Sequence, residues 1–229
     1  MFMSAPKPMK MTLRVLAHLL RYPDRELRAH LGELSEALQQ ESALPAKRIA
    51  ELQALIQHLA TQDPLGVESE YVDLFDRGRS TALHLFEHVH GDSRDRGPAM
   101  IDLIQTYEQA GLYLDAEELP DHLPVLLEFA STQPPSQAAE FLSETAHIVR
   151  VIFSALLKRE SAYASVLAAV LELAGEKAEP VAVVADQPMD ETWAEPEVFD
   201  GCSIAGQARA RQAQPIRIVK NPASLGVQP

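Results

Sequence analysis

Three histidines lie within seven positions of this 229-residue chain, at His84, His88 and His90. Imidazole nitrogens ligate zinc and related metals, and His84 and His88 have the i, i+4 spacing that places two rings on one helix face. The string is H-L-F-E-H, however, whereas the zinc-protease pattern H-E-x-x-H has its glutamate beside the first histidine. No second Cys or His cluster supplies further ligands, which weakens the case for a metal site. A metal- or cofactor-handling protein that uses these histidines is therefore the alternative hypothesis and not the first one.

The same segment also mixes charged and apolar side chains, which suggests a binding surface. Its remaining members are Leu83, Leu85, Phe86, Glu87, Asp92, Arg94 and Asp95. A run of charges is often no more than a solvated loop, and that interpretation stays open. A mixture of apolar and charged groups also suits a groove that binds an amphipathic helical peptide. We therefore predict a peptide-binding site that includes this segment.

The string P-D-H-L-P, residues 120–124, places two prolines where a helix begins. Asp121 can cap that helix, because a side-chain carboxylate accepts the free N–H groups of a first helical turn. Capping does not explain the adjacent His122. We therefore add Asp121 and His122 to the predicted peptide-binding site.

The string E-Y-V-D-L-F, residues 70–75, carries Tyr71, Leu74 and Phe75 at helical spacing. Such spacing is typical first of residues that face a core. A tyrosine can still present its hydroxyl at the edge of a groove, so Tyr71 and Phe75 are included as candidate peptide contacts.

Motifs for catalysis are absent from the sequence. There is no G-x-S-x-G nucleophile elbow, no P-loop and no dinucleotide-binding fingerprint. The single cysteine, Cys202, follows a proline-rich stretch without a setting that would activate a thiolate. We expect neither enzymatic activity nor a bound cofactor.

Helices must position these residues, because apolar side chains recur at helical spacing through most of the chain up to residue 175. The spacing predicts helices over about residues 9–22, 24–38, 45–59, 64–75, 100–111, 119–131, 137–160 and 161–175. Residues 76–99 are expected to form a loop, a short helix and another loop. No convincing alternating strand is present, so the sequence predicts an all-α fold with one globular domain over residues 1–175.

Composition changes after Gly175. Residues 176–229 are first acidic and then basic, are broken by prolines, and lack an apolar stripe that could offset the entropy of ordering. We expect this tail to be mostly disordered. Trp193 and Phe199 are its large aromatic residues and could dock on the body or on a partner.

The formal net charge is −13, which argues against nucleic acid as a partner because phosphate binding needs a basic face. A basic peptide is a more suitable partner. One cysteine cannot form an internal disulfide framework, which indicates a reducing compartment. The N-terminus resembles neither a signal peptide nor a membrane span, so we expect a cytoplasmic protein without stable membrane insertion. Helical proteins of this kind can exchange elements between copies, so a homo-oligomer is compatible with the sequence.

Three strings resemble the respiratory nitrate reductase assembly chaperones, known as the delta-subunit or NarJ group of the TorD-like redox-enzyme maturation proteins. They are Y-V-D-L-F-D-R-G-R-S at Tyr71–Ser80, L-H-L-F-E-H-V-H-G-D-S-R-D-R-G at Leu83–Gly97 and E-L-P-D-H-L-P at Glu118–Pro124. The resemblance extends over about residues 10–175 and is looser in the tail.

This resemblance implies an all-α chaperone fold and a function. Such proteins bind the N-terminal segment of the nitrate reductase catalytic (alpha) subunit and hold it until the molybdenum cofactor is inserted, and they are not part of the finished enzyme. In related proteins the peptide site lies near the D-H motif and the charged loop. Carried over here, that site would include Tyr71, the 83–95 segment, Asp121 and His122.

Overall fold

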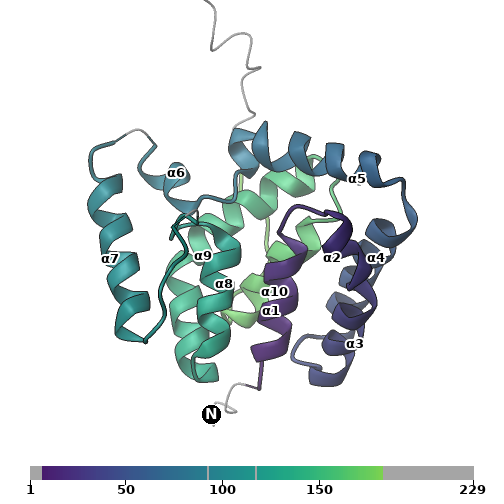
Figure 1. Cartoon of the computed structure of the whole chain (residues 1–229), viewed down its shortest axis with the longest axis horizontal. Coiled ribbons are helices and arrows are strands. Elements are labelled where there is room, and N and C mark those ends of the chain that lie inside the picture. The colour runs from purple at the N-terminus through teal and green to yellow at the C-terminus, as the bar shows by residue number, and fades with distance from the viewer. Residues whose placement is uncertain (1–6, 92, 117, 183–229) are drawn as a thin grey trace, which may run out of the picture. The chain divides into compact units, whose positions relative to one another are not determined.

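The computed structural model describes residues 7–91, 93–116 and 118–182 (Figure 1). These residues belong to a compact unit that spans Met1–Asp186, and a second unit, Gln187–Pro229, lies wholly outside the described residues. Trp193, Phe199 and Cys202, together with most of the predicted tail, therefore lie outside the described residues as well.

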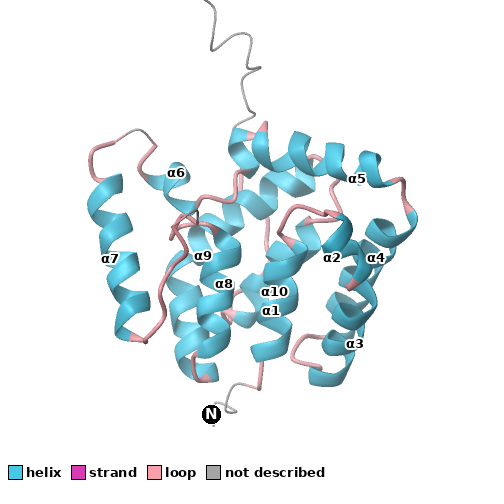
Figure 2. Ribbon diagram, in the orientation of Figure 1, coloured by secondary structure: helices cyan, strands magenta, loops and turns pink. Residues whose placement is uncertain are grey.

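Every regular element in the described residues is a helix, which confirms the predicted all-α fold (Figure 2). A π-helical turn (Val72–Asp76) and a 3-10 turn (Arg79–Thr81) lie between α5 and α6. The α-helices in chain order are α1 (Lys10–Leu19), α2 (Arg25–Ala29), α3 (Leu31–Glu41), α4 (Ala46–Thr61), α5 (Pro64–Tyr71), α6 (Leu85–Val89), α7 (Arg96–Gln109), α8 (Leu123–Thr132), α9 (Pro135–Lys158) and α10 (Ala164–Leu173).

The core forms around α1 and α10, because both helices are apolar on most of their surface. α1 packs against α8, α3 and α10, and α10 packs against α9 and α4 (Figure 1). Leu13, Leu16 and Leu19 of α1 are fully buried, and nine of the ten residues of α10 are buried. Burial of one such leucine stabilises the fold by about 2 kcal/mol.

Two predicted helices differ from the observed elements. The helix predicted over 24–38 begins as expected, with the Asp24 carboxylate accepting the Leu27 N–H at 2.8 Å, but it is divided into α2 and α3. At the break, the His30 ring lies 2.9 Å from the Glu26 carbonyl, a side-chain contact that competes with the helical backbone. The helix predicted from residue 119 begins only at Leu123, because the backbone before it pairs with residues 83–85.

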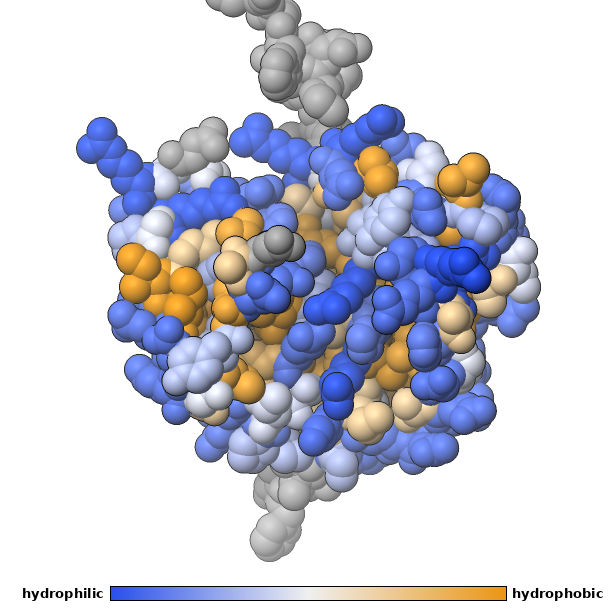
Figure 3. Space-filling view, viewed as in Figure 1, coloured by the Kyte–Doolittle hydropathy of each residue, from blue (hydrophilic) through white to orange (hydrophobic). Residues whose placement is uncertain are grey.

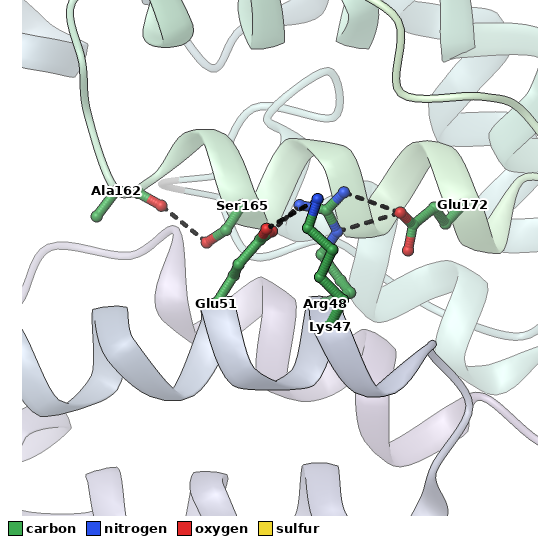
Figure 4. A network of polar contacts seen from close by, with 6 residues as sticks. All are labelled: Lys47, Arg48, Glu51, Ala162, Ser165 and Glu172. Carbon is green, nitrogen blue, oxygen red and sulfur yellow. Dashed lines mark hydrogen bonds and ion pairs between the residues drawn. The ribbon is translucent and has the colours of Figure 1, made fainter.

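Helices far apart in the sequence are also joined by polar contacts. The Arg48 guanidinium on α4 lies between Glu51 on its own helix and Glu172 on α10, and Arg48 Nη2 is 2.8 Å from the Glu172 carboxylate (Figure 4). The Arg48 side chain is largely buried, at 15% exposure, whereas Glu51 is 37% and Glu172 is 26% exposed, and the pair with Glu172 links α4 to α10.

The chain continues to contact the body after α10. Gly175 has a positive φ of 80° that turns the backbone at the end of the helix. Glu176 then lies 2.7 Å from the Arg150 guanidinium, and the Val181 N–H donates to the Ser154 hydroxyl at 2.9 Å. The described residues 176–182 thus pack along α9, although the sequence suggested that the disordered tail begins at residue 176.

A tight junction around Gly78 leads into the functional segment. The Thr81 hydroxyl donates to the Leu74 carbonyl, and Arg159 donates to the Asp73 carbonyl at 2.8 Å. A Cβ atom on Gly78 would overlap with Thr81, Leu74 and Arg159, so glycine is required at this position. The junction fixes where the chain enters the 83–96 segment.

Candidate functional site

Two segments that the sequence singled out separately lie side by side. The Leu85 N–H donates to the Asp121 carbonyl at 3.0 Å, and the Leu123 N–H donates to the Leu83 carbonyl at 2.9 Å. These bonds flank an antiparallel bridge between His84 and His122. Because the backbone around Asp121 pairs with the 83–85 segment in this way, it cannot join the helix, and α8 begins later than predicted.

Asp121 is the centre of a polar cluster at this bridge. Its side chain is fully buried, and its Oδ2 accepts the Phe86 N–H of α6 at 3.1 Å. His84 Nδ1 lies 3.5 Å from Oδ1, and the Arg96 guanidinium lies 3.8 Å from Oδ2. We call the following residues the Asp121 cluster: His84, Glu87, Arg96, Glu118, Asp121 and His122.

The two histidines of the cluster have pKa values shifted in opposite directions. Their rings stack with centroids 4.9 Å apart. The Asp121 carboxylate, whose Oδ1 lies 3.5 Å from His84 Nδ1, raises the pKa of His84 above its usual 6.5. Burial lowers the pKa of His122, and a positive charge on His84 lowers it further, against the Glu118 carboxylate 3.5 Å away. The arrangement therefore favours one positive charge, on His84.

The three histidines that suggested a metal site have three different environments. His84 stacks on His122, His88 Nε2 lies 2.8 Å from the Ala82 carbonyl, and the His90 ring packs edge-on against Phe86 at 5.6 Å. Among the described residues, no group of three His, Cys, Asp or Glu side chains is arranged to hold a metal ion.

The remaining residues of the 83–95 segment divide into core and surface. Leu83 and Leu85 belong to the main core, and Phe86 packs against it. Glu87 is exposed and lies 3.5 Å from the Arg96 guanidinium. Arg94 and Asp95 are exposed as well, and Asp95 contacts Ser93. Asp92 lies outside the described residues.

Tyr71 and Phe75 lie in the core. Each is 6% exposed, and the Tyr71 hydroxyl donates to the Leu20 carbonyl at 2.8 Å. Both rings contact Tyr163, with centroid distances of 6.2 and 5.1 Å. The structure therefore gives them the core role that their spacing indicated first, and it directs the Tyr71 hydroxyl inward.

α7 covers this region loosely. Of its fourteen residues only Tyr107 is buried, and its hydroxyl donates to the Pro120 carbonyl at 2.8 Å. Arg96 at its first turn reaches both Asp121 and Glu87, so α7 has polar anchors on the 118–122 turn and on α6. α7 stands at the left edge in Figure 1, and the same edge shows apolar surface in Figure 3. Ile101 of α7 is 55% exposed.

A groove of about 680 Å³ lies beside the cluster, between α1, α8 and the 112–115 segment; we call it the α1–α8 groove. One wall is the polar face of α1. The apolar lining comes from Val125 and Phe129 of α8, with Tyr107 and Leu112. In Figure 3 hydrophilic surface over α1 runs beside apolar surface over α8. The wall residues are Lys10, Arg14 and His18 of α1, and Arg21, which follows its end.

The groove and the cluster share one residue, Glu118. Its carboxylate lies 3.5 Å from His122 and 3.9 Å from Arg21, and Arg21 also pairs with Glu128 of α8 at 2.9 Å. Burial lowers the pKa of His18 on the same wall, with a smaller contribution from the charge of Arg21. Glu118 and Arg21 therefore lie between the groove and His122.

The groove residues were not identified as site residues from the sequence. Arg14, His18 and Arg21 interrupt an otherwise apolar helix at spacings of four and three, which is the signal that marks one polar face. Such a stripe is typical of any solvated helix. Its meaning depends on α8 lying beside it, and only the fold shows that.

Comparison with known proteins places the chain in a family. Residues 22–169 match the model of the family described as nitrate reductase delta subunit. The chain is 44% identical over 183 residues to the nitrate reductase molybdenum cofactor assembly chaperone NarJ of Escherichia coli K12, covering 79% of this chain and 78% of that protein. It is 38% identical to the probable assembly chaperone NarW of the same organism, covering 81% and 82% of the two chains.

The fold comparison agrees. A crystal structure of a putative redox enzyme maturation protein from Archaeoglobus fulgidus superposes with a TM-score of 0.51 at 22% identity, covering 77% of this chain and 98% of that chain. At this identity the likeness concerns the fold. Among the described helices, none combines the length and apolar character needed to cross a membrane.

Proposed function

Because the chain belongs to the nitrate reductase delta subunit family, we propose that it is the assembly chaperone of a respiratory nitrate reductase. In this role it binds the N-terminal segment of the catalytic subunit in the cytoplasm. It keeps that subunit competent for molybdenum cofactor insertion and complex assembly, and it leaves before the enzyme is complete. It performs no chemistry of its own.

The observation that carries this proposal is the 44% identity to a relative named as a molybdenum cofactor assembly chaperone, over most of both chains. The family-model match over residues 22–169 includes the Asp121 cluster and the α8 side of the α1–α8 groove, whereas the wall formed by Lys10, Arg14, His18 and Arg21 precedes it. The cluster contains no exposed nucleophile with a base beside it. Its fully buried carboxylate, Asp121, accepts the Phe86 N–H and lies next to the side chains of His84 and Arg96. Such a cluster supports binding better than catalysis.

The α1–α8 groove is where we place the client segment. Its apolar lining by Val125 and Phe129 suits the apolar face of an amphipathic helix, and the carboxylates of Glu118 and Glu128 suit basic residues beside that face. The exposed Glu87, Arg94 and Asp95 extend the charged surface past the cluster. In this arrangement Asp121 and His122 hold the residues beside the groove in place and do not contact the peptide themselves.

A direct titration tests the proposal. A synthetic peptide of the N-terminal segment of the cognate catalytic subunit, titrated calorimetrically into the folded protein, should bind with one site per chain. A scrambled peptide of the same composition serves as control, since charge attraction alone would bind both. Absence of binding at high micromolar peptide, with the protein folded by circular dichroism, would sink the proposal.

A cellular experiment tests the later step. In cells that lack this chain, the catalytic subunit should accumulate without molybdenum cofactor, and expression of the chain should restore cofactor content. The chain should then be found in the cytoplasmic fraction and not in the purified enzyme. Full cofactor content without the chain would contradict the assembly role.

The alternative of a metal-handling protein has a separate test. Metal analysis of protein purified without a histidine tag should find no stoichiometric metal. A stoichiometric metal that is lost on His88→Gln would favour the alternative instead.

A further inference from the structure

The charged groups that line the α1–α8 groove balance in number, with Lys10, Arg14 and Arg21 against Asp115, Glu118 and Glu128, but among the described residues they are paired only around Arg21. We infer that the groove selects a client helix by its charge order, with basic residues at the Arg21 end and an acidic residue at the Lys10 end. This inference rests on the proposed function and deepens it, because it states the chemistry of the segment that the groove accepts.

The Lys10 end of the groove carries two free cations. Lys10 and Arg14 are one helical turn apart on the groove wall and both are exposed. Within the part of the chain that the structure describes, neither side chain has an ion pair or hydrogen bond. Two unpaired cations one turn apart favour a carboxylate placed between them.

The Arg21 end has the opposite balance. Arg21 is the only cation among the groove residues there, and it lies beside two carboxylates, Glu118 at 3.9 Å and Glu128 at 2.9 Å. This end therefore carries an excess of one negative charge when His122, whose pKa is lowered, is neutral. A basic side chain of the client can share these carboxylates with Arg21.

The dimensions suit a short helix. The α1 wall rises by about 12 Å between Lys10 and His18, which corresponds to somewhat more than two helical turns of an occupant lying alongside. Val125 and Phe129 are four residues apart on α8 and present one apolar stripe to that occupant. The partner is therefore an amphipathic helix whose basic and acidic residues lie at opposite ends of its apolar face.

The decisive variant reverses the free cations, Lys10→Glu with Arg14→Glu. Neither side chain has a hydrogen bond or ion pair within the described residues. The Glu41 carboxylate already accepts the Met11 and Thr12 N–H groups at the start of α1, so a glutamate at residue 10 adds a like charge there and the fold of the variant must be checked. Arg25→Glu with Lys158→Glu changes the net charge equally at exposed residues outside the groove and is the matched control. Circular dichroism checks that both proteins are folded.

Calorimetry then uses the cognate N-terminal peptide and versions of it in which each acidic residue is replaced by lysine in turn. We expect the groove variant to bind the native peptide at least tenfold more weakly than wild type, and the control about as well as wild type. One lysine version of the peptide should recover most of the lost affinity on the groove variant and lose affinity on wild type.

Two results overturn the inference while the proposed function stands: the groove variant binds the native peptide as wild type does, or no lysine version recovers binding to it. Failure of the native peptide to bind wild type is a different result and removes the proposed function itself. Measurements at low and high salt add a check, since a loss that depends on charge shrinks as salt screens it.

Discussion

The Asp121 cluster and the α1–α8 groove contain the same kinds of side chains but use them in opposite ways. In the cluster, a fully buried carboxylate faces a backbone N–H, a histidine and an arginine. In the groove, Lys10 and Arg14 face solvent without a partner in the described residues. In the cluster, polar groups contact one another and join two segments that are distant in the sequence. In the groove, Lys10 and Arg14 remain free to bind a partner.

This difference matters for where recognition occurs. A buried polar group that is already satisfied contributes to position and stability, whereas exposed charges beside an apolar stripe can still gain from a partner. Asp121 is closer to the first kind, since its Oδ2 accepts the Phe86 N–H and faces Arg96, although its Oδ1 has no hydrogen bond within the described residues. Substitutions in the two regions should therefore affect different measurements, stability in one and binding in the other.

The largest expected effect is on stability, from Asp121→Ala. Removal of this carboxylate leaves the Phe86 N–H without its acceptor and leaves His84 and Arg96 beside an uncharged cavity. Breaking a buried charged network from one side costs about 3 kcal/mol, which urea unfolding measures. Asp121→Asn keeps an acceptor oxygen and should cost less. Equal stability of Asp121→Ala and wild type would show that the cluster does not hold the two segments together.

A smaller effect on stability is expected from Tyr107→Phe. This substitution tests the hydrogen bond that anchors α7 without changing the ring that packs in the groove. The substitution keeps the ring against Phe129 but removes the hydroxyl that donates to the Pro120 carbonyl. Loss of this buried hydrogen bond should cost about 1 kcal/mol. Hydrogen exchange should become faster in α7 and stay unchanged in α10. Uniform acceleration in both helices would contradict the view that α7 is anchored separately.

In the groove, Arg21→Gln should barely change stability, because both of its ion pairs are more than a third exposed and such pairs contribute at most about 0.5 kcal/mol. It should strengthen binding of a basic client segment by a few fold, since Glu118 and Glu128 lose their competing cation. Peptide titration and urea unfolding of the same variant measure the two effects. Weaker binding would show that Arg21 contacts the client favourably.

The sequence predicted the helical fold well, because leucine spacing and the positions of prolines and caps are local signals. It brought attention to Asp121 and the 83–96 segment but assigned them to the peptide surface, whereas the structure buries Leu83, Leu85 and Asp121. Burial depends on the bridge between residues 84 and 122, and no local pattern encodes a contact across that distance. For the same reason the sequence predicts Tyr71 as a peptide contact, although its hydroxyl donates to the Leu20 carbonyl inside the core.

The smallest expected effect is the pH dependence of the histidines in the cluster and in the groove. In a histidine titration by NMR, His84 should titrate above 6.5, because Asp121 raises its pKa, and His122 and His18 should titrate below 6.5, chiefly because of burial. The stability that His84 contributes is complete below pH 6.5 and is lost as the pH rises through its raised pKa. The contribution of His122 has the opposite sign, since stability falls as the pH drops from 6.5 toward its lowered pKa.

Asp121→Asn tests the assignment within the same titration. Without the carboxylate, the pKa of His84 should fall. His122 loses the direct effect of the Asp121 charge, which raises its pKa, and also part of the larger effect of the His84 charge, which lowers it, so its pKa should change less than that of His84. His18 is in the groove wall and should titrate as before, since its shift comes from burial and Arg21. A matching shift of His18 would mean that the cluster and the groove respond as one unit, coupled through Glu118 and Arg21, and would replace the separation of the two regions by a direct electrostatic link.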